Sequence, residues 1–215
     1  MNIPHRERAR AFLAEAEMLN PGPWVQHSLF VAQAAEAIAE AHPDLDAETG
    51  YILGILHDIG RRAGVTNLRH IIDGYTFLHA LGFEDAAQIS MTHSFPVRDI
   101  RVVNGQWDCS PEELQFIEAY LAQVEFSTYD RLLQLCDALA LPSGFCLIEK
   151  RLVDVALRHG VHEHTLARWR GYFAVQAELE AAIGASIYSL LPGVIENTFA
   201  PMQVDPETCK PRSGI

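Results

Sequence analysis

Apolar residues recur every three to four positions along most of the chain, which is the spacing of amphipathic helices. No stretch alternates apolar and polar residues for long enough to indicate a strand. Asn20-Pro21-Gly22-Pro23 ends the first helix, and Ser110-Pro111-Glu112-Glu113 begins a later one as a capping box. The expected helices cover residues 6–19, 24–41, 46–57, 68–81, 84–93, 110–124, 129–140, 144–159 and 163–183, with a short one that ends at 191. The pattern therefore predicts an all-α protein, a helical bundle with additional C-terminal helices.

The segment 94–109 interrupts this pattern and is expected to be a loop, with a short hairpin around Asn104-Gly105 as an alternative. No internal repeat and no Gly-, Ser- or Pro-rich linker divides the chain. We therefore expect a single domain over 1–192, with its core at about 24–142 and further helices at about 144–191. Residues 193–215 are expected to form an irregular tail.

Composition and charge narrow the function classes. The net charge of −12 repels phosphate backbones, so general nucleic-acid binding is not expected. The apolar runs are too short to span a bilayer, and the charged N-terminus lacks the apolar centre of a signal peptide. The four cysteines form no CxxC pair, which is typical of a reducing compartment. We therefore expect a cytoplasmic protein with no membrane partner.

The chain has ten histidines among 215 residues, and one of them adjoins an aspartate at the end of the most apolar helix. This pair is His57-Asp58, in the sequence Leu56-His57-Asp58-Ile59-Gly60. Buried polar groups are costly unless they are paired or bound to a metal. Imidazole nitrogen and carboxylate oxygen together suit Fe, Mn, Zn or Co. The pair therefore indicates a transition-metal site at this helix end.

Further candidate ligands lie at other helix ends and in apolar stretches. His27 opens the second helix, Asp137 lies in an apolar helix, and His70 and His93 flank a helical stretch. His79 competes with His70, and the spacing of His70, Gly74 and Leu78 on one helix face favours His70. Asp130 competes with Asp137, but it looks like a helix-start residue on the surface. The alternative for His27 and His93 is an exposed helix-end histidine, and for Arg61 a solvated charge.

The remaining histidines are expected to have no special role. His159, His162 and His164 lie at an expected helix end and turn, where histidine interacts with the helix dipole and with solvent. His5 and His42 are expected at the surface. The region 144–190 could complete the core, cover the site or form a subunit contact, and the sequence leaves these alternatives open.

The order H…HD…H…H…D resembles the HD-domain superfamily of metal-dependent phosphohydrolases, over about residues 24–142. His57-Asp58-Ile59-Gly60 has the commonest form of that family's central motif. The resemblance implies a core of about five helices and one or two divalent transition metals, of which Fe, Mn, Co, Ni and Zn are the candidates. It implies His27, His57, Asp58 and Asp137 as the ligands of one metal. His70 and His93 would hold a second metal, with Asp58 bridging the two.

The resemblance also implies a reaction, the hydrolysis of a phosphate ester or anhydride by metal-activated water. The substrate would be a nucleotide or another small phosphorylated metabolite. Asp58 would orient the water, and Arg61 stands where many relatives have a lysine that contacts phosphate. Arg62 or Arg98 could assist Arg61. The family's GYP motif is missing, so hydrolysis of cyclic di-GMP is not expected.

Two other functions are compatible with the same residues. One is an HD-fold diiron oxygenase, which uses the same six ligands. The other is a metal- or nucleotide-binding module without turnover. The identity of the substrate, the identity of the metal and the oligomeric state are left open by the sequence.

Overall fold

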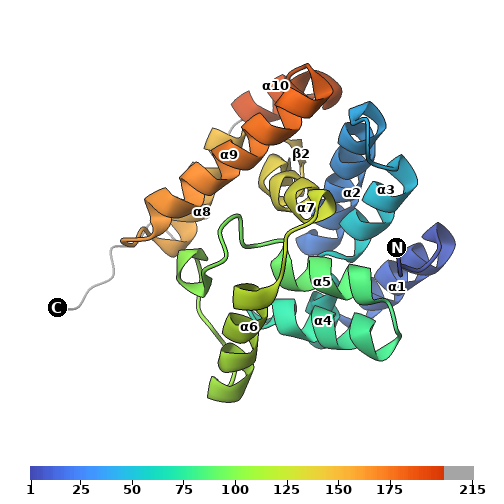
Figure 1. Cartoon of the computed structure of the whole chain (residues 1–215), viewed down its shortest axis with the longest axis vertical. Helices are drawn as coiled ribbons and strands as arrows, with labels where there is room; N and C mark the ends of the chain where they lie inside the picture. The colour runs from blue at the N-terminus through green and yellow to red at the C-terminus, as the bar shows by residue number, and fades with distance from the viewer. Residues whose placement is uncertain (201–215) are drawn as a thin grey trace.

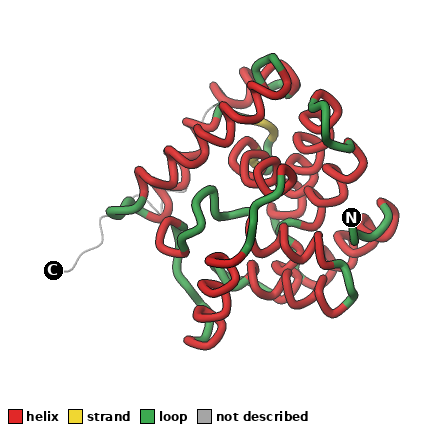
Figure 2. Tube along the Cα trace, in the orientation of Figure 1, coloured by secondary structure: helices red, strands yellow, loops and turns green. Residues whose placement is uncertain are grey.

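A computed structural model describes residues 1–200 of the chain, and it confirms the all-α prediction. Figure 2 shows that helices make up most of the described chain. The helices are α1 (Arg6–Leu19), α2 (Pro23–Ala41), α3 (Ala47–Leu56), α4 (His70–Ala80), α5 (Glu84–Thr92), α6 (Pro111–Gln123), α7 (Thr128–Leu139), α8 (Ile148–His159), α9 (Thr165–Ile183) and α10 (Val194–Phe199). Three short 3-10 helices, η1 (Ile59–Ala63), η2 (Ile100–Val102) and η3 (Ile187–Leu190), and two strands, β1 (Ala140–Leu141) and β2 (Gly144–Phe145), complete the structure.

The helix starts follow from local capping. Ser110 and Glu113 form the predicted capping box of α6, in which each side chain accepts the backbone N–H of the other residue. Asp46 caps α3 by accepting the N–H of Thr49 at 2.8 Å. Ser127 begins α7 with a second capping box that the sequence analysis did not identify. Capping involves residues close in sequence, so most helix boundaries could be predicted within a few residues.

The buried helix α3 is the centre of the core. Residues 50–56 of α3 are all buried, and α2, α1, α5 and α7 pack around them. The contact with α2 is very close, because a Cβ on Gly54 would lie 2.4 Å from the Cα of Ala32. Figure 1 shows α2 and α3 beside each other, with α4, α5 and α6 below them. A second apolar cluster, which includes Ile71, Met91 and Phe95, joins α4, α5 and α6.

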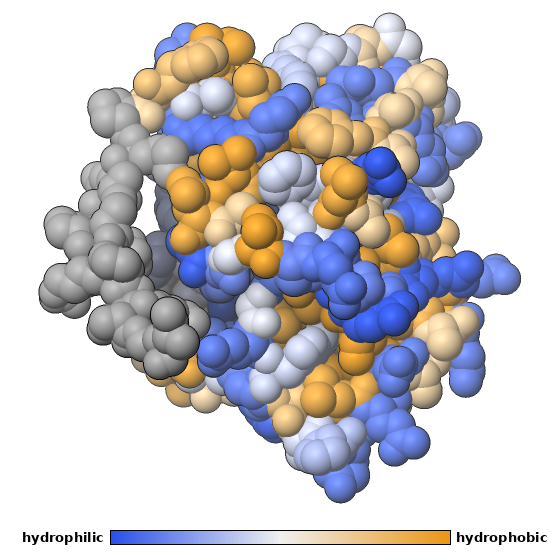
Figure 3. Space-filling view, turned by 90° about the vertical axis from the view of Figure 1, so that its left-hand side faces the viewer, coloured by the Kyte–Doolittle hydropathy of each residue, from blue (hydrophilic) through white to orange (hydrophobic). Residues whose placement is uncertain are grey.

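The C-terminal helices complete the bundle on the other side of α7. Both α8 and α9 pack against α7, and α10 packs against β2. Figure 1 shows α7 between this group and the pair α2–α3. Within the described residues, no helix is both long and apolar enough to cross a membrane. Figure 3 shows hydrophilic and hydrophobic residues interspersed over one face, so this face by itself indicates no particular partner.

The segment 94–109 is mostly a loop, as predicted, and the alternative hairpin around Asn104-Gly105 is absent from the described chain. The short helix η2 precedes these residues and is capped by Asp99. Two predictions about local structure are wrong. The helix expected over 144–159 begins only at Ile148, because residues 144–145 pair with 140–141 around a turn. The predicted irregular tail begins too early, because α10 covers 194–199. The side chain of Asn197 anchors α10 to the carbonyl of Phe145 at 2.8 Å, a tertiary contact. Residues 201–215 of the predicted tail lie outside the described residues.

Candidate metal centre

His57 and Asp58 follow the last turn of α3, and the packing of this helix decides where they lie. Because α3 is surrounded by other helices, its C-terminal end opens into the interior of the molecule rather than into solvent. His57 is 0% exposed and Asp58 is 4% exposed. The helix therefore delivers an imidazole and a carboxylate to a buried position.

Two glycines allow α4 and α5 to approach these residues. A Cβ on Gly60 would lie 1.9 Å from the carbonyl oxygen of His70, and a Cβ on Gly74 would lie 2.0 Å from Ser90 Oγ. A larger residue at Gly60 would require a shift of the backbone, and one at Gly74 would displace the side chain of Ser90. The close packing of η1, α4 and α5 places His70, the first residue of α4, directly beside Asp58.

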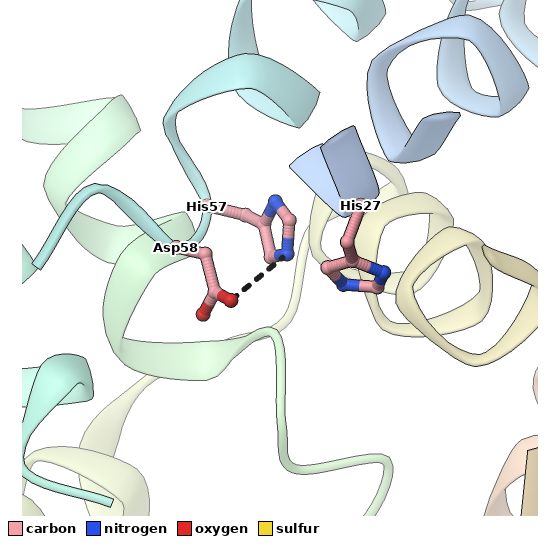
Figure 4. Close-up of side chains that lie close together, drawn as sticks. All are labelled: His27, His57 and Asp58. Atoms are coloured by element: carbon pink, nitrogen blue, oxygen red, sulfur yellow. Dashed lines mark ion pairs between the residues drawn. The ribbon is translucent and has the colours of Figure 1, made fainter. Parts of the chain in front are cut away.

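Two groups of three side chains meet at Asp58. One group is His27, His57 and Asp58, and the other is Asp58, His70 and His93. In each group the ligand atoms all lie within 4.8 Å of one another. Figure 4 shows the imidazole of His57 facing the carboxylate of Asp58, with His27 from α2 on the other side of His57. His27 lies in α2 and His70 in α4, whereas His57, Asp58 and His93 directly follow the ends of α3 and α5. Asp58 is common to both groups.

The distances around Asp58 are short on both sides of its carboxylate. Asp58 Oδ1 lies 3.1 Å from His70 Nε2 and 3.6 Å from His93 Nε2. Asp58 Oδ2 lies 4.0 Å from His57 Nε2. Asp137 belongs to neither group, but its Oδ1 lies 3.0 Å from His27 Nε2. The structure thus brings the six predicted site residues to one place, with Asp137 at its edge.

Three of the histidines are oriented in the same way. His57 Nδ1 donates to the carbonyl of Gly54 at 2.7 Å, and His93 Nδ1 donates to the carbonyl of Ser90 at 2.9 Å. His70 Nδ1 likewise donates to a carbonyl, that of Asn67. A carbonyl can only accept, so each of these Nδ1 atoms carries a proton and Nε2 is the ring nitrogen that points toward Asp58. Metal-binding histidines are held by this kind of contact.

The donor set fits a divalent metal. His57 Nε2 is buried and has no hydrogen-bond partner among the described residues, and leaving such an atom unsatisfied is unfavourable. Burial lowers the pKa of His57, and it lowers the pKa of His93 to about 3, so both rings are neutral at pH 7. Burial alone would raise the pKa of Asp58, but Arg61 and His70 hold it well below its usual range. Neutral imidazoles and an ionised carboxylate are the protonation states that a metal ion requires.

Comparison with known families agrees with this geometry. Residues 24–141, just over half of the chain, match the HD domain. The chain belongs to the HD-domain family. No curated protein and no solved structure matches the chain. His57-Asp58 lies within the matched residues, and this pair is called the HD motif below. HD domains are mostly metal-dependent phosphohydrolases.

Arg61 lies beside the HD motif and is not a solvated charge. Its Nε donates to Asp58 Oδ2 at 2.5 Å, and its NH2 lies 3.5 Å from His70 Nε2. Its side chain is 29% exposed and borders the cavity described below. Arg62 instead pairs with Glu15 at 2.6 Å, and Arg98 donates to the carbonyl of Val124 at 3.0 Å. Neither of these two borders the cavity.

The competing residues lie elsewhere. His79 is exposed on α4, where its Nδ1 lies 2.8 Å from Glu84 Oε2. Asp130 does start a helix, but the prediction that it lies on the surface is wrong, because it is 0% exposed. It accepts hydrogen bonds from Ser127, from Gln88 and from Thr92, and so connects α7 to α5. The prediction of a surface position also fails for His42, which is 8% exposed.

A cavity of about 890 Å³ opens beside the HD motif. The predicted residues His27, Asp58, Arg61, His70, His93 and Asp137 border it. The wall of the cavity also carries basic side chains that the sequence analysis missed, namely Lys150, Arg151, Arg158 and Arg168 from α8 and α9. A signal for α8 was present, because Arg151, Asp154 and Arg158 recur at helical spacing and so mark one polar face. The region 144–190 therefore contributes to the wall of the site.

Proposed function

We propose that this protein is a metal-dependent phosphohydrolase that cleaves a phosphate ester or anhydride of a nucleotide or another small phosphorylated metabolite. One observation carries the proposal: Asp58 is shared by two buried His/Asp groups at the edge of a cavity that also presents guanidinium groups. Membership of the HD-domain family supports the same reaction class. The size of the cavity suits a small ligand, since such sites measure roughly 300–1,000 Å³.

The ligands would be divided between two metals. His27, His57, Asp58 and Asp137 would hold one metal, and His70 and His93 would hold a second one with Asp58. Divalent metals bound there supply Lewis acidity and a water molecule of lowered pKa. The neighbours of Asp58 keep its carboxylate ionised and oriented. It would therefore need little rearrangement to serve as a ligand in both groups.

Arg61 would act on the substrate rather than on the metal. Its guanidinium borders the cavity next to Asp58 and has further N–H groups besides the Nε–H that Asp58 accepts. A planar guanidinium can donate two parallel hydrogen bonds to phosphoryl oxygens, and it offsets the charge that develops there. We therefore assign to Arg61 the binding of the phosphoryl group that reacts.

Metal content tests the site directly. We expect about two transition metals per chain in the freshly purified protein, and fewer, close to one, in His70→Ala. His79→Ala is a matched control on the same helix, and we expect it to keep the wild-type content because His79 is exposed and away from both groups. Elemental analysis of the three proteins gives the answer. Absence of metal after anaerobic reloading would overturn the proposal.

The reaction needs a separate experiment, because an HD-fold oxygenase would use the same ligands. The basic wall of the cavity favours an anionic substrate and hence the phosphohydrolase. We expect the metal-loaded protein to release phosphate from some members of a panel of nucleotides and phosphorylated metabolites. Oxygen uptake by the iron-loaded, partly reduced protein without phosphate release would support the oxygenase. Tight nucleotide binding without product would support a binding module.

A further inference from the structure

Within residues 1–200, Arg168 is a buried arginine that has no acidic partner. It lies on α9, borders the cavity and is 8% exposed. Its NH1 donates to Asn104 Oδ1 at 2.9 Å and its NH2 donates to Tyr172 OH at 3.1 Å. Its Nε–H is buried and has no partner within residues 1–200. Both of its side-chain partners are neutral.

The other arginines of the cavity differ from Arg168 in this respect. Arg61 pairs with Asp58 at 2.5 Å, and Arg151 and Arg158 pair with Asp154 at 3.2 and 2.7 Å. No carboxylate of the described chain lies within ion-pair distance of Arg168. Burying a charge without a counter-charge is strongly unfavourable. An anionic ligand bound in the cavity would supply the counter-charge that this buried guanidinium lacks.

The guanidinium of Arg168 is also held in place. Asn104, which accepts from it, donates its own Nδ2 to the carbonyl of Gly160 at 3.0 Å. Tyr172 is 2% exposed, so its hydroxyl is fixed within the core. A preorganised donor binds an anion with little loss of side-chain entropy. The arrangement is therefore that of a binding group and not that of a mobile surface charge.

Arg151 adds positive charge at the same wall. Arg151 and Arg158 share the single carboxylate of Asp154, so the three arginines of this wall exceed the acidic groups paired with them. Burial and the charges of Arg158, Arg151 and Arg168 together lower the pKa of His159, which lies among them. Lys150 is also positively charged, but its Nζ donates to three backbone carbonyls, those of Asn197, Thr198 and Ala200, so it has no free N–H to offer an anion.

We propose that Arg168 and Arg151, neither of which belongs to the His/Asp groups, form an anion subsite that binds a second phosphate of the substrate. The subsite deepens and rests on the proposed function, in which the reacting phosphoryl group lies at Arg61 and the metals. The substrate class is then a metabolite with at least two phosphate groups rather than a monophosphate. Because the whole chain carries a net charge of −12, such a substrate depends on this local positive charge.

Binding of inorganic pyrophosphate to the metal-free protein tests the subsite without turnover. Titration calorimetry after chelation is expected to show binding to the wild type and a Kd at least about ten-fold weaker for Arg168→Gln. Arg170→Gln is the matched control, because Arg170 is exposed on the same helix and does not border the cavity. Its Kd is expected to stay within about two-fold of the wild type. Equal pyrophosphate affinity in the wild type and Arg168→Gln would overturn the subsite.

Kinetics separates this inference from the proposed function. With metal-loaded protein, we expect Arg168→Gln to raise KM for a nucleoside diphosphate about ten-fold and to leave KM for the monophosphate little changed. Equal losses on both substrates would overturn the subsite while hydrolysis stands. If the wild type hydrolyses no member of the panel of nucleotides and phosphorylated metabolites, the proposed function fails, and the pyrophosphate titration still decides the subsite.

Two further variants protect the test against misfolding of Arg168→Gln. Arg168→Lys keeps a positive charge but loses the planar donor set, and Arg151→Gln changes a more exposed side chain. Weaker pyrophosphate binding in Arg151→Gln, with an unchanged thermal unfolding midpoint, supports the subsite. Wild-type affinity in both of these variants overturns it.

Discussion

Two regions of the molecule border the same cavity, but they are built in opposite ways. Around α3 the helices turn their apolar faces inward, and polar groups reach the site only at helix ends. His57 caps the end of α3, His93 caps the end of α5 and His70 begins α4. The metal candidates are therefore coupled to the core of the fold.

In part of helix α8 the arrangement is reversed, because charged side chains face the cavity and apolar side chains are exposed. Its charged residues Arg151 and Arg158 border the cavity, whereas Val153 and Leu157 are 49% and 69% exposed. Only one edge of the helix, with Leu152, joins the core. The comparison indicates that Arg151 and Arg158 of α8 can change with little effect on folding, whereas the His/Asp groups are embedded in the core of the fold.

The largest effect is expected from Asp58→Ala, which removes the carboxylate that both groups share. We expect metal to be lost and hydrolysis to fall by about a hundred-fold or more, because the reaction depends on the site as a unit. Elemental analysis and phosphate release on one preparation measure both quantities. Arg168→Gln changes a cavity residue outside both groups and is expected to keep its metal. Full activity of metal-free Asp58→Ala would refute the assignment of the centre.

Two glycine substitutions, one in α3 and one at the end of α9, compare how strongly each region depends on close packing. In Gly54→Ala the new Cβ would lie 2.4 Å from the Cα of Ala32, so α2 and α3 must move apart. We expect a loss of about 3 kcal/mol in the free energy of unfolding. Gly184→Ala, at the end of α9, meets no atom within 4 Å but has φ +75°. Backbone strain at residue 184 is expected to lower the free energy of unfolding by about 1 kcal/mol. Urea unfolding measures both variants, and a larger loss for Gly184→Ala than for Gly54→Ala would contradict this prediction.

Acid is expected to weaken the α3 region of the metal-free protein. Burial lowers the pKa of His93 to about 3 and also lowers the pKa of His57, so the folded protein binds their protons less readily than the unfolded chain. The stability from these neutral rings is complete above about pH 6.5 and is lost as the pH falls toward the folded pKa values. Each histidine contributes a slope of about 1.4 kcal/mol per pH unit within that window.

Urea unfolding in the presence of a chelator at pH 7, 6 and 5 measures this slope. His93→Gln is expected to reduce the slope, because the substituted side chain does not titrate. The exposed His79 supplies the control, and His79→Gln is expected to retain the wild-type slope. Identical slopes in all three proteins would show that burial of His93 is not the cause.

The smallest effect is expected on the outer side of α8. Leu157→Ala removes a side chain that is 69% exposed, and we expect a change within about 0.5 kcal/mol. Leu152→Ala on the same helix removes a side chain that is 4% exposed, and it is expected to cost about 2–3 kcal/mol. Thermal unfolding of the two variants compares their losses of stability, and so checks that Leu157 is exposed while Leu152 is in the core. A larger loss for Leu157→Ala would mean that a partner covers this side of the helix.

Local signals made most of the fold predictable. Caps such as Asp46 and Ser110 and breakers such as Pro21 act on residues a few positions away, so the helix boundaries could be derived without a structure. The order of the histidines and aspartates, with the central His57-Asp58, indicated the family and the candidate site. Which of these residues bind a metal stays a prediction, and the metal-content experiment tests it.

The tertiary structure decided what depends on contacts between distant residues. His27 and Asp137 are 110 positions apart, and packing of α2 against α7 brings them to 3.0 Å. Asp130 is buried because α5 covers the start of α7, although its capping role is local. The sequence alone thus determined the helices and the chemistry of the HD motif, since both are expressed over a few neighbouring residues. Only the packing of α8 and α9 on α7 decided that Arg151 and Arg168 face the same cavity, because burial and charge pairing are properties of the assembled bundle.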